Sequence, residues 1–147
     1  MAVFIALLRA HASATRGLSG ELLEEHGLTL NDYEALLRLS RAEGGMLRRV
    51  DLSRELLLTP SGITRLLEGL ERAGYVERKN CESDARVTYA ALTRLGRAKL
   101  KEASRSHVAS IRELFGARFS DAELATLAEL LERLTTENQD EETCLPE

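Results

Sequence analysis

The sequence feature that most constrains the fold is the dipeptide Thr59-Pro60. A threonine hydroxyl accepts a hydrogen bond from a free backbone N–H in the first turn of a helix, and proline is tolerated in that turn. The pair therefore predicts a helix start, Gly74 predicts its end, and a short helix over about residues 50–57 precedes it. The second helix has apolar residues at the spacing of one buried face, namely Ile63, Leu66, Leu67 and Leu70.

A β-hairpin is predicted directly after this helix. Residues 75–79 and 86–92 include β-branched and aromatic residues, which favour strands, and the polar residues 80–84 separate the two segments. A short helix, a tight turn, a capped helix and a hairpin rich in Lys and Arg then follow one another. This order predicts a winged helix-turn-helix centred on Thr59 to Arg72, with a wing from Glu77 to Leu92.

Most of the remaining chain is predicted to be helical. Ala and Leu dominate its apolar residues and only 4% of all residues are aromatic, which is typical of helices because these side chains lose little rotamer freedom there. We therefore expect a mainly α fold with a small β-hairpin wing. Apolar periodicity and capping residues place the other helices at about 3–25, from Thr29 to Gly44-Gly45, at 94–115 after Thr93, and from Ser120 to about Thr136.

The last helix carries more apolar surface than a small domain can cover. Its main stripe consists of leucines at helical spacing, and exposed in solution it would promote aggregation. Packing on the preceding helix and packing on a second copy of the chain are both expected to contribute. The stripe contains Leu124, Leu127, Leu131 and Leu134.

The charge is unevenly distributed along the chain. The net charge is -4, yet residues 46–97 carry ten Lys/Arg against seven Asp/Glu, while the rest carries ten against seventeen. A basic segment in an acidic protein is typical of a nucleic-acid-binding module attached to a solvated scaffold. It supports an interaction of the central segment with DNA.

The polar face of the helix after Thr59 carries the candidate base-reading residues. At 100° per residue, Ser61, Arg65, Glu68 and Arg72 lie opposite the apolar face, with Gly62 and Thr64 on its flanks. Small and hydroxyl-bearing residues beside an Arg suit close approach to base edges in a major groove. An ordinary amphipathic surface helix is the alternative interpretation of the same pattern.

The predicted wing tip contains a second candidate contact. Arg86 lies two residues after Asp84. A guanidinium is attracted by the negative potential of a minor groove, and a nearby carboxylate can hold it in one direction. The alternative is a solvated hairpin turn.

Together these motifs resemble the MarR family of bacterial transcription regulators. The resemblance rests on residues 51–56, residues 59–78, the Asp84-Ala85-Arg86 turn and residues 92–96, and the helix order extends it over nearly the whole chain. It implies a single domain over 1–147, with a DNA-binding lobe at 30–92, dimerisation helices at 1–28 and 93–137, and a tail at 138–147 that we expect to be disordered.

The resemblance also implies roles for individual residues. Ser61, Thr64 and Arg65 become the candidates for base contacts, Arg86 the minor-groove residue and Asp84 its orienting partner. The phosphate contacts would position the protein without reading sequence, and their candidates are Arg54, Arg72, Arg78 and Lys79. Arg72 is the weakest of these because it lies late in the helix, where Glu68 is a competing partner.

By the same resemblance, we expect a ligand-responsive repressor that binds an inverted-repeat operator as a homodimer. Relatives release DNA when a phenolic or other aromatic effector binds between the dimer helices and the DNA-binding lobe. The candidate effector contacts here are His11, Arg16, Tyr33 and His107. The three histidines show no metal-ligand spacing, and neither a metal nor a cofactor is expected.

The sequence is open to two other interpretations, and a third is not expected. Cys81 lies close to Lys79, where cations favour a thiolate, which would suit a redox-sensing regulator. A winged helix can also bind protein instead of DNA. An enzyme is not expected, since Ser61 has no activating neighbour and no nucleophile or phosphate-loop motif is present. The sequence lacks an apolar segment of membrane-spanning length and a signal peptide, so we expect a cytoplasmic protein.

Overall fold

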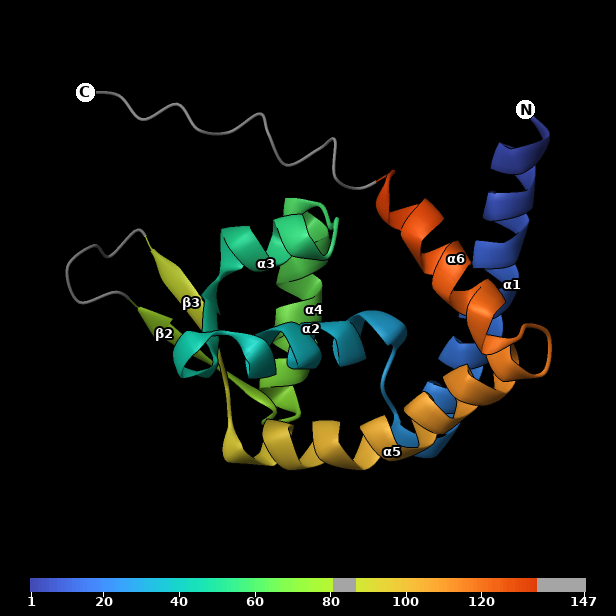
Figure 1. The fold of residues 1–147 in the computed structure, drawn as a ribbon. Coiled ribbons are helices and arrows are strands. Elements are labelled where there is room, and N and C mark those ends of the chain that lie inside the picture. Colours follow the sequence, from blue (N-terminus) through green and yellow to red (C-terminus); the bar gives the residue numbers. More distant parts are fainter. Residues whose placement is uncertain (81–86, 135–147) are drawn as a thin grey trace, which may run out of the picture. The chain divides into compact units, whose positions relative to one another are not determined.

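The structure is a computed structural model that describes residues 1–80 and 87–134. It forms two compact units, which divide within the fifth helix between Ala109 and Ser110. The first unit contains most of the secondary structure, and the second contains the end of that helix and the last helix (Figure 1). The mainly α fold predicted from the sequence is confirmed.

Helix α1 ends and helix α2 begins at the residues that the sequence marks. Helix α1 spans Ala2–His26 and ends at Gly27, whose φ of 65° is the left-handed conformation that glycine adopts without strain. Helix α2 spans Leu30–Arg41. The Thr29 hydroxyl accepts from the Asp32 backbone N–H, and the Asp32 carboxylate accepts from the Thr29 N–H in return, which makes a complete capping box.

A third strand was missed by the sequence analysis. Helix α2 stops at Arg41, before its predicted end at Gly44-Gly45. The two glycines instead belong to a short 3₁₀ turn, η1 (Glu43–Gly45), and strand β1 (Met46–Arg48) follows it. Strands β2 (Val76–Asn80) and β3 (Thr88–Leu92) form the predicted hairpin. The sheet has the order β1-β3-β2 and both pairs are antiparallel, with Leu47 opposite Ala90 and Arg78 opposite Ala90 on the other side. Three residues are too few for a recognisable alternation, which explains the omission.

Helices α3 (Arg49–Glu55) and α4 (Pro60–Arg72) form the predicted pair. The Thr59 hydroxyl accepts from the Gly62 N–H at 3.1 Å, and Pro60 occupies the first turn of α4. In the turn between the helices, Leu57 has a φ of 53°. Such a conformation is unfavourable for a residue with a Cβ.

A hydroxyl and a glycine join the end of the hairpin to helix α5 (Arg94–Gly116). The Thr93 hydroxyl donates to the Gly74 carbonyl at 2.7 Å and accepts from the Gly96 N–H at 3.0 Å, so the predicted cap is present. A Cβ at residue 96 would overlap the Tyr75 carbonyl. Glycine is therefore required where α5 passes the start of β2.

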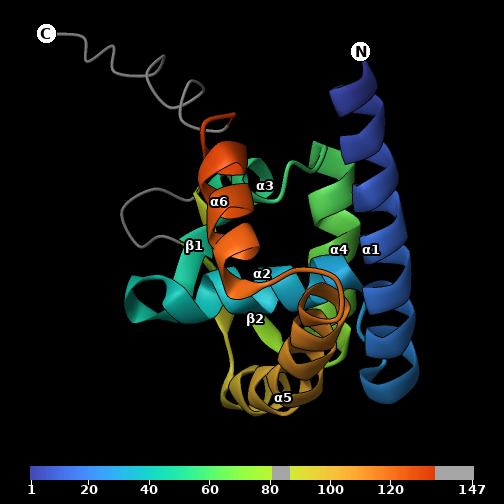
Figure 2. The same ribbon diagram turned by 45° about the vertical axis from the view of Figure 1, so that its right-hand side comes forward.

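The core of the first unit lies where helices α1 to α5 meet the sheet. It is aliphatic apart from Tyr33. Its fully enclosed leucines come from α1, α2 and α3, whose ribbons are seen in Figures 1 and 2, and from the loop before α2. Burial of this surface is the main force holding α4 in place. The largest fully buried side chains are Leu22, Leu28, Leu36, Leu39 and Leu52.

In the second unit, helix α6 spans Asp121–Glu132. Its predicted capping box is present, because the Ser120 hydroxyl accepts from the Glu123 N–H and the Glu123 carboxylate accepts from the Ser120 N–H. These bonds lower the pKa of Glu123, the backbone bond contributing most. No residue of α6 is buried. The predicted extension to Thr136 and the predicted disordered tail lie outside the described residues, apart from 133 and 134.

Candidate nucleic-acid interface

Helix α4 presents one buried and one exposed face, as the sequence predicts. Ile63, Leu67 and Leu70 are buried in the core and Leu66 is half-buried. The opposite face is open to solvent over its whole length. It displays Ser61, Arg65, Glu68 and Arg72.

The hydroxyl of Thr64 both donates and accepts a hydrogen bond within the chain. Its Oγ1 donates to the Pro60 carbonyl at 2.8 Å and accepts from Nη2 of Arg49, also at 2.8 Å. Arg49 is the first residue of α3 and is half-buried, and the sequence analysis did not single it out. The preceding residue, Arg48, is also an arginine. What distinguishes Arg49 from Arg48 is its contact with Thr64 on α4.

The N-terminal turn of α4 is compact. The Ser61 hydroxyl lies 3.2 Å from that of Thr59, which also caps the helix. A Cβ at Gly62 would lie 3.2 Å from Thr59 Oγ1, so glycine leaves room for the cap. A Cβ at Gly69 would have no atom within 4 Å, so no close neighbour among the described residues explains that glycine.

The candidate phosphate contacts differ in the hydrogen bonds and ion pairs that they already form within the chain. Arg54 on α3 is exposed. Nε of Arg72 donates to the Glu68 carbonyl at 3.1 Å, which is a backbone partner, whereas the sequence analysis considered the carboxylate. In the wing, Arg78 donates to Thr88 across the hairpin at 3.4 Å, and Lys79 forms an exposed ion pair with Glu77 at 3.1 Å. Asp84, Arg86 and Cys81 lie outside the described residues.

The four candidate effector contacts do not form one cluster. His11 and Arg16 are exposed on α1. Tyr33 and His107 are buried together in the core, and their rings meet edge to face with centroids 4.5 Å apart. The Tyr33 hydroxyl also lies 3.1 Å from that of Ser104 on α5.

His107 is the one buried polar residue among those that the structure describes. Its Nδ1 is buried without a hydrogen-bond partner. Burial lowers the pKa of His107, the charges of Glu21 and Glu34 oppose the shift, and His26 adds to it. His26, which the sequence analysis left without a role, contacts the Ser106 hydroxyl at 2.7 Å and links the end of α1 to α5.

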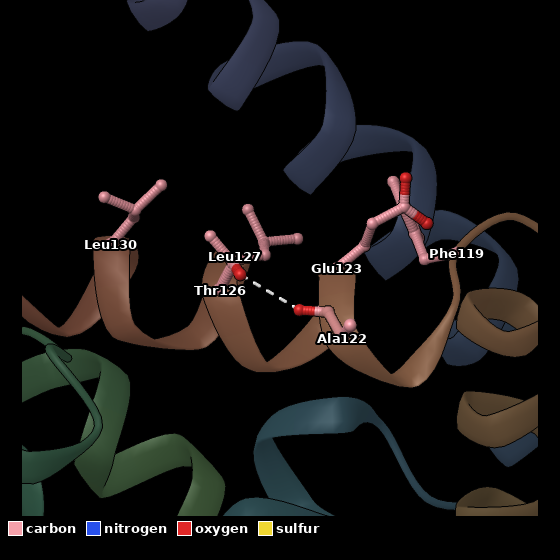
Figure 3. Close-up of a pocket in the computed structure, with 6 residues that line it drawn as sticks. All are labelled: Phe119, Ala122, Glu123, Thr126, Leu127 and Leu130. Carbon is pink, nitrogen blue, oxygen red and sulfur yellow. Dashed lines mark hydrogen bonds between the residues drawn. The ribbon is translucent and has the colours of Figure 1, made fainter.

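Two open hollows lie on helix surfaces and neither contains Tyr33 or His107. One, of about 690 Å³, is lined by Glu68, Glu71 and Arg72 on α4. The other, of about 410 Å³, runs along α6, where Leu127 and Leu130 lie on the same side of the helix as Phe119 (Figure 3). Within residues 1–80 and 87–134, no three His, Cys, Asp or Glu side chains are grouped closely enough to hold a metal ion. In the same residues, no helix is long and apolar enough to cross a membrane.

Two helices joined by a short turn and followed by an antiparallel hairpin define the chain as a winged helix-turn-helix protein. The profile of the MarR family matches residues 26–87. The chain is 30% identical over 112 residues to the transcriptional repressor YetL of Bacillus subtilis, covering 74% of this chain and 67% of YetL. The chain belongs to the MarR family, which consists of transcription regulators and not of enzymes.

Solved structures agree with this assignment. The MarR family regulator AbsC of Streptomyces coelicolor is 33% identical, with a TM-score of 0.78 over 90% of this chain and 91% of AbsC. Sco3205, a MarR family regulator from the same organism that was crystallised with DNA, is 26% identical. Its TM-score is 0.87 over 98% of this chain and 90% of Sco3205.

Proposed function

We propose that the chain is a sequence-specific repressor that binds double-stranded DNA as a homodimer, with α4 in the major groove. The observation that carries the proposal is the exposed face of α4. Its buried face fixes the helix on the core, so Arg65 is displayed on a rigid support and free of any ion pair that the structure records. Arg is the residue that most often reads guanine in a major groove.

The surroundings of α4 fit the same role. Arg54 on α3 and Arg78 and Lys79 on β2 add exposed positive charge on the elements that flank it in the fold. Backbone phosphates attract such side chains and so set the register of the protein on the duplex. The relatives support it too, because YetL is a repressor and Sco3205 was crystallised with DNA.

Exposed apolar side chains support a homodimer. At the start of α1, Val3 is 82% exposed and Phe4 60% exposed, and on α6 Leu130 is 52% exposed. Large exposed apolar patches usually mark a site of contact with another protein chain. A two-fold dimer presents two equivalent α4 helices and therefore selects an inverted repeat, with half-sites about 10 bp apart.

We extend the proposal to release of DNA by a small aromatic effector. Its support is the buried Tyr33–His107 pair, because an aromatic ligand with a hydroxyl could satisfy Nδ1 of His107. His11 and Arg16, exposed on α1, have a weaker claim than this pair. Titration of phenolic compounds against the DNA complex tests the extension, and an unchanged affinity with every compound would remove it.

Selection from a random duplex pool, followed by fluorescence anisotropy at several salt concentrations, tests DNA binding itself. Arg65→Ala should cost about 1 to 3 kcal/mol on the selected site and relax preference at adjacent base pairs. Arg105→Ala is the matched control, since Arg105 is an exposed arginine on α5 and the charge lost is the same. Absence of salt-dependent binding to any duplex would favour a protein-interaction module instead.

A further inference from the structure

The hydroxyl of Thr64 has little capacity left for DNA. A threonine hydroxyl offers one proton and two lone pairs. Its proton is donated to the Pro60 carbonyl, and one lone pair accepts from Arg49. Thr64 therefore has no proton left to donate to guanine or to thymine O4.

The methyl group is itself a means of reading sequence. Thymine alone among the DNA bases carries a methyl group in the major groove, and a threonine methyl is one of the apolar groups known to contact it. Thr64 lies on the flank of the exposed α4 face, next to Arg65, and is half-exposed. It is therefore accessible for such a contact if α4 enters the groove.

Arg49 is positioned to fix the direction of that methyl group. Threonine in a helix divides its population between two side-chain rotamers, because its hydroxyl can bond the preceding turn in either. A second bond from a charged guanidinium stabilises the rotamer that receives it. Arg48, the last residue of β1, instead pairs with Asp51 in the first turn of α3 at 3.9 Å.

We propose that Thr64 recognises a thymine through its methyl group, and that Arg49 is the positioning residue that holds Thr64 in the reading rotamer. The inference rests on the proposed function, since it assumes that α4 occupies a major groove. It names the base read at this position and assigns the first residue of α3 a part in specificity.

The first experiment removes single methyl groups, from the DNA and from residue 64 of the protein in turn. In the selected site, each thymine is replaced in turn by deoxyuridine, which lacks the methyl group. In each half-site, replacement of one particular thymine should weaken binding by the wild-type protein about fourfold. This is the effect of one buried methyl-sized group. Thr64→Ser should bind thymine and uracil there equally, whereas Thr64→Val should still prefer thymine.

The second experiment isolates Arg49. Arg49→Met should reduce the preference for thymine over uracil, whereas Arg48→Met, which loses the same charge one residue earlier, should preserve it. Both variants should lower the salt dependence of binding if both arginines lie near phosphates. Adding Thr64→Val to Arg49→Met should restore the preference, because valine in a helix keeps one rotamer without help. Melting temperatures show whether folding has changed, and a loss of stability alone would not alter the ratio of thymine to uracil binding.

The inference is overturned if Thr64→Val loses the preference, since valine keeps the methyl group and the methyl group would then not be what distinguishes thymine from uracil. It is also overturned if no uracil replacement affects the wild type more than Thr64→Ser. Equal ratios in Arg49→Met and the wild type would remove Arg49 from the mechanism. Each of these results leaves DNA binding in place, whereas a wild-type protein that binds no duplex would end the proposed function and this inference together.

Discussion

Helices α4 and α6 begin alike and are buried differently. Each starts with a hydroxyl cap, Thr59 or Ser120, and they contain 13 and 12 residues respectively. Each has an apolar stripe at helical spacing. Yet α4 has three buried residues, and α6 has none.

The difference shows what an apolar stripe does and does not specify. The stripe of α4 meets side chains of its own unit, and the free energy of that burial fixes the helix that we propose to contact DNA. The leucines of α6 stay partly or fully open, and Figure 3 shows Leu127 and Leu130 beside one another along the helix. We infer that α4 is stabilised within the chain and α6 by a second copy.

The largest effect is expected in the core under α4. Leu67 is 2% exposed, so Leu67→Ala should lower the free energy of unfolding by about 2 to 5 kcal/mol, through lost burial and the cavity left behind. Urea unfolding at fixed protein concentration measures it. The matched control is Leu57→Ala, the same truncation at a residue that is 92% exposed. A loss at Leu67 no larger than at Leu57 would contradict the packing described for α4.

The next effect should appear in assembly. Leu130 on α6 is 52% exposed, so Leu130→Glu should scarcely alter the stability of a single chain. In a two-fold dimer it places two like charges in an apolar interface and should raise the dimer dissociation constant about 30-fold or more. Sedimentation velocity measures the change. Ala125→Glu, on the opposite face of α6, adds the same charge and should leave the dimer intact.

If Leu130→Glu and Ala125→Glu sediment alike, α6 does not form the interface. The dimer would then depend on other surfaces, such as the exposed start of α1. The stability of α6 would then not be due to packing against a second copy of the chain.

Local sequence signals predicted most of the fold. Hydroxyl caps at Thr29, Thr59, Thr93 and Ser120 set helix starts because their hydrogen bonds are made within three residues. Strand β1 was missed because it is only three residues long and depends on pairing with β3, about 40 residues later. A long-range pairing of a short segment leaves no periodic signal.

The candidate site was only partly predictable for the same reason. The face of α4 follows from helical spacing, so Ser61 and Arg65 were identified and are exposed. Arg49 was missed because its contact with Thr64 spans 15 residues and two helices. The meeting of Tyr33 with His107 likewise depends on the packing of α2 and α5, which no local pattern specifies.

A third prediction concerns pH and the core that supports α4. The pKa of His107 is lowered below its ordinary value of 6.5 by burial, so below that pH the unfolded chain binds protons that the folded chain resists. The free energy of unfolding should therefore fall as the pH is lowered through 6.5 towards the pKa of the folded state. His107→Phe should flatten this part of the profile, whereas replacement of the exposed His11 by Asn should not. Melting curves between pH 5.5 and 7.5 check it, and parallel profiles for all three proteins would show that another group is responsible.

The smallest effect lies in the turns that precede the two helices. Leu57, before α4, is the one residue other than glycine with a positive φ among those described, at 53°, and the turn before α6 contains none. The left-handed conformation costs a residue with a Cβ about 1 to 2 kcal/mol, and glycine avoids it at the expense of a more flexible unfolded chain. Since the Leu57 side chain is 92% exposed, little burial is lost on its removal. Leu57→Gly should therefore raise the free energy of unfolding by up to about 1 kcal/mol. The same change at the exposed Leu95, in the first turn of α5, should lower it, because glycine has the larger backbone entropy in the unfolded chain. Urea unfolding of both variants distinguishes the two signs, and a loss of stability at Leu57 as well would mean that its side chain makes a contact in the dimer.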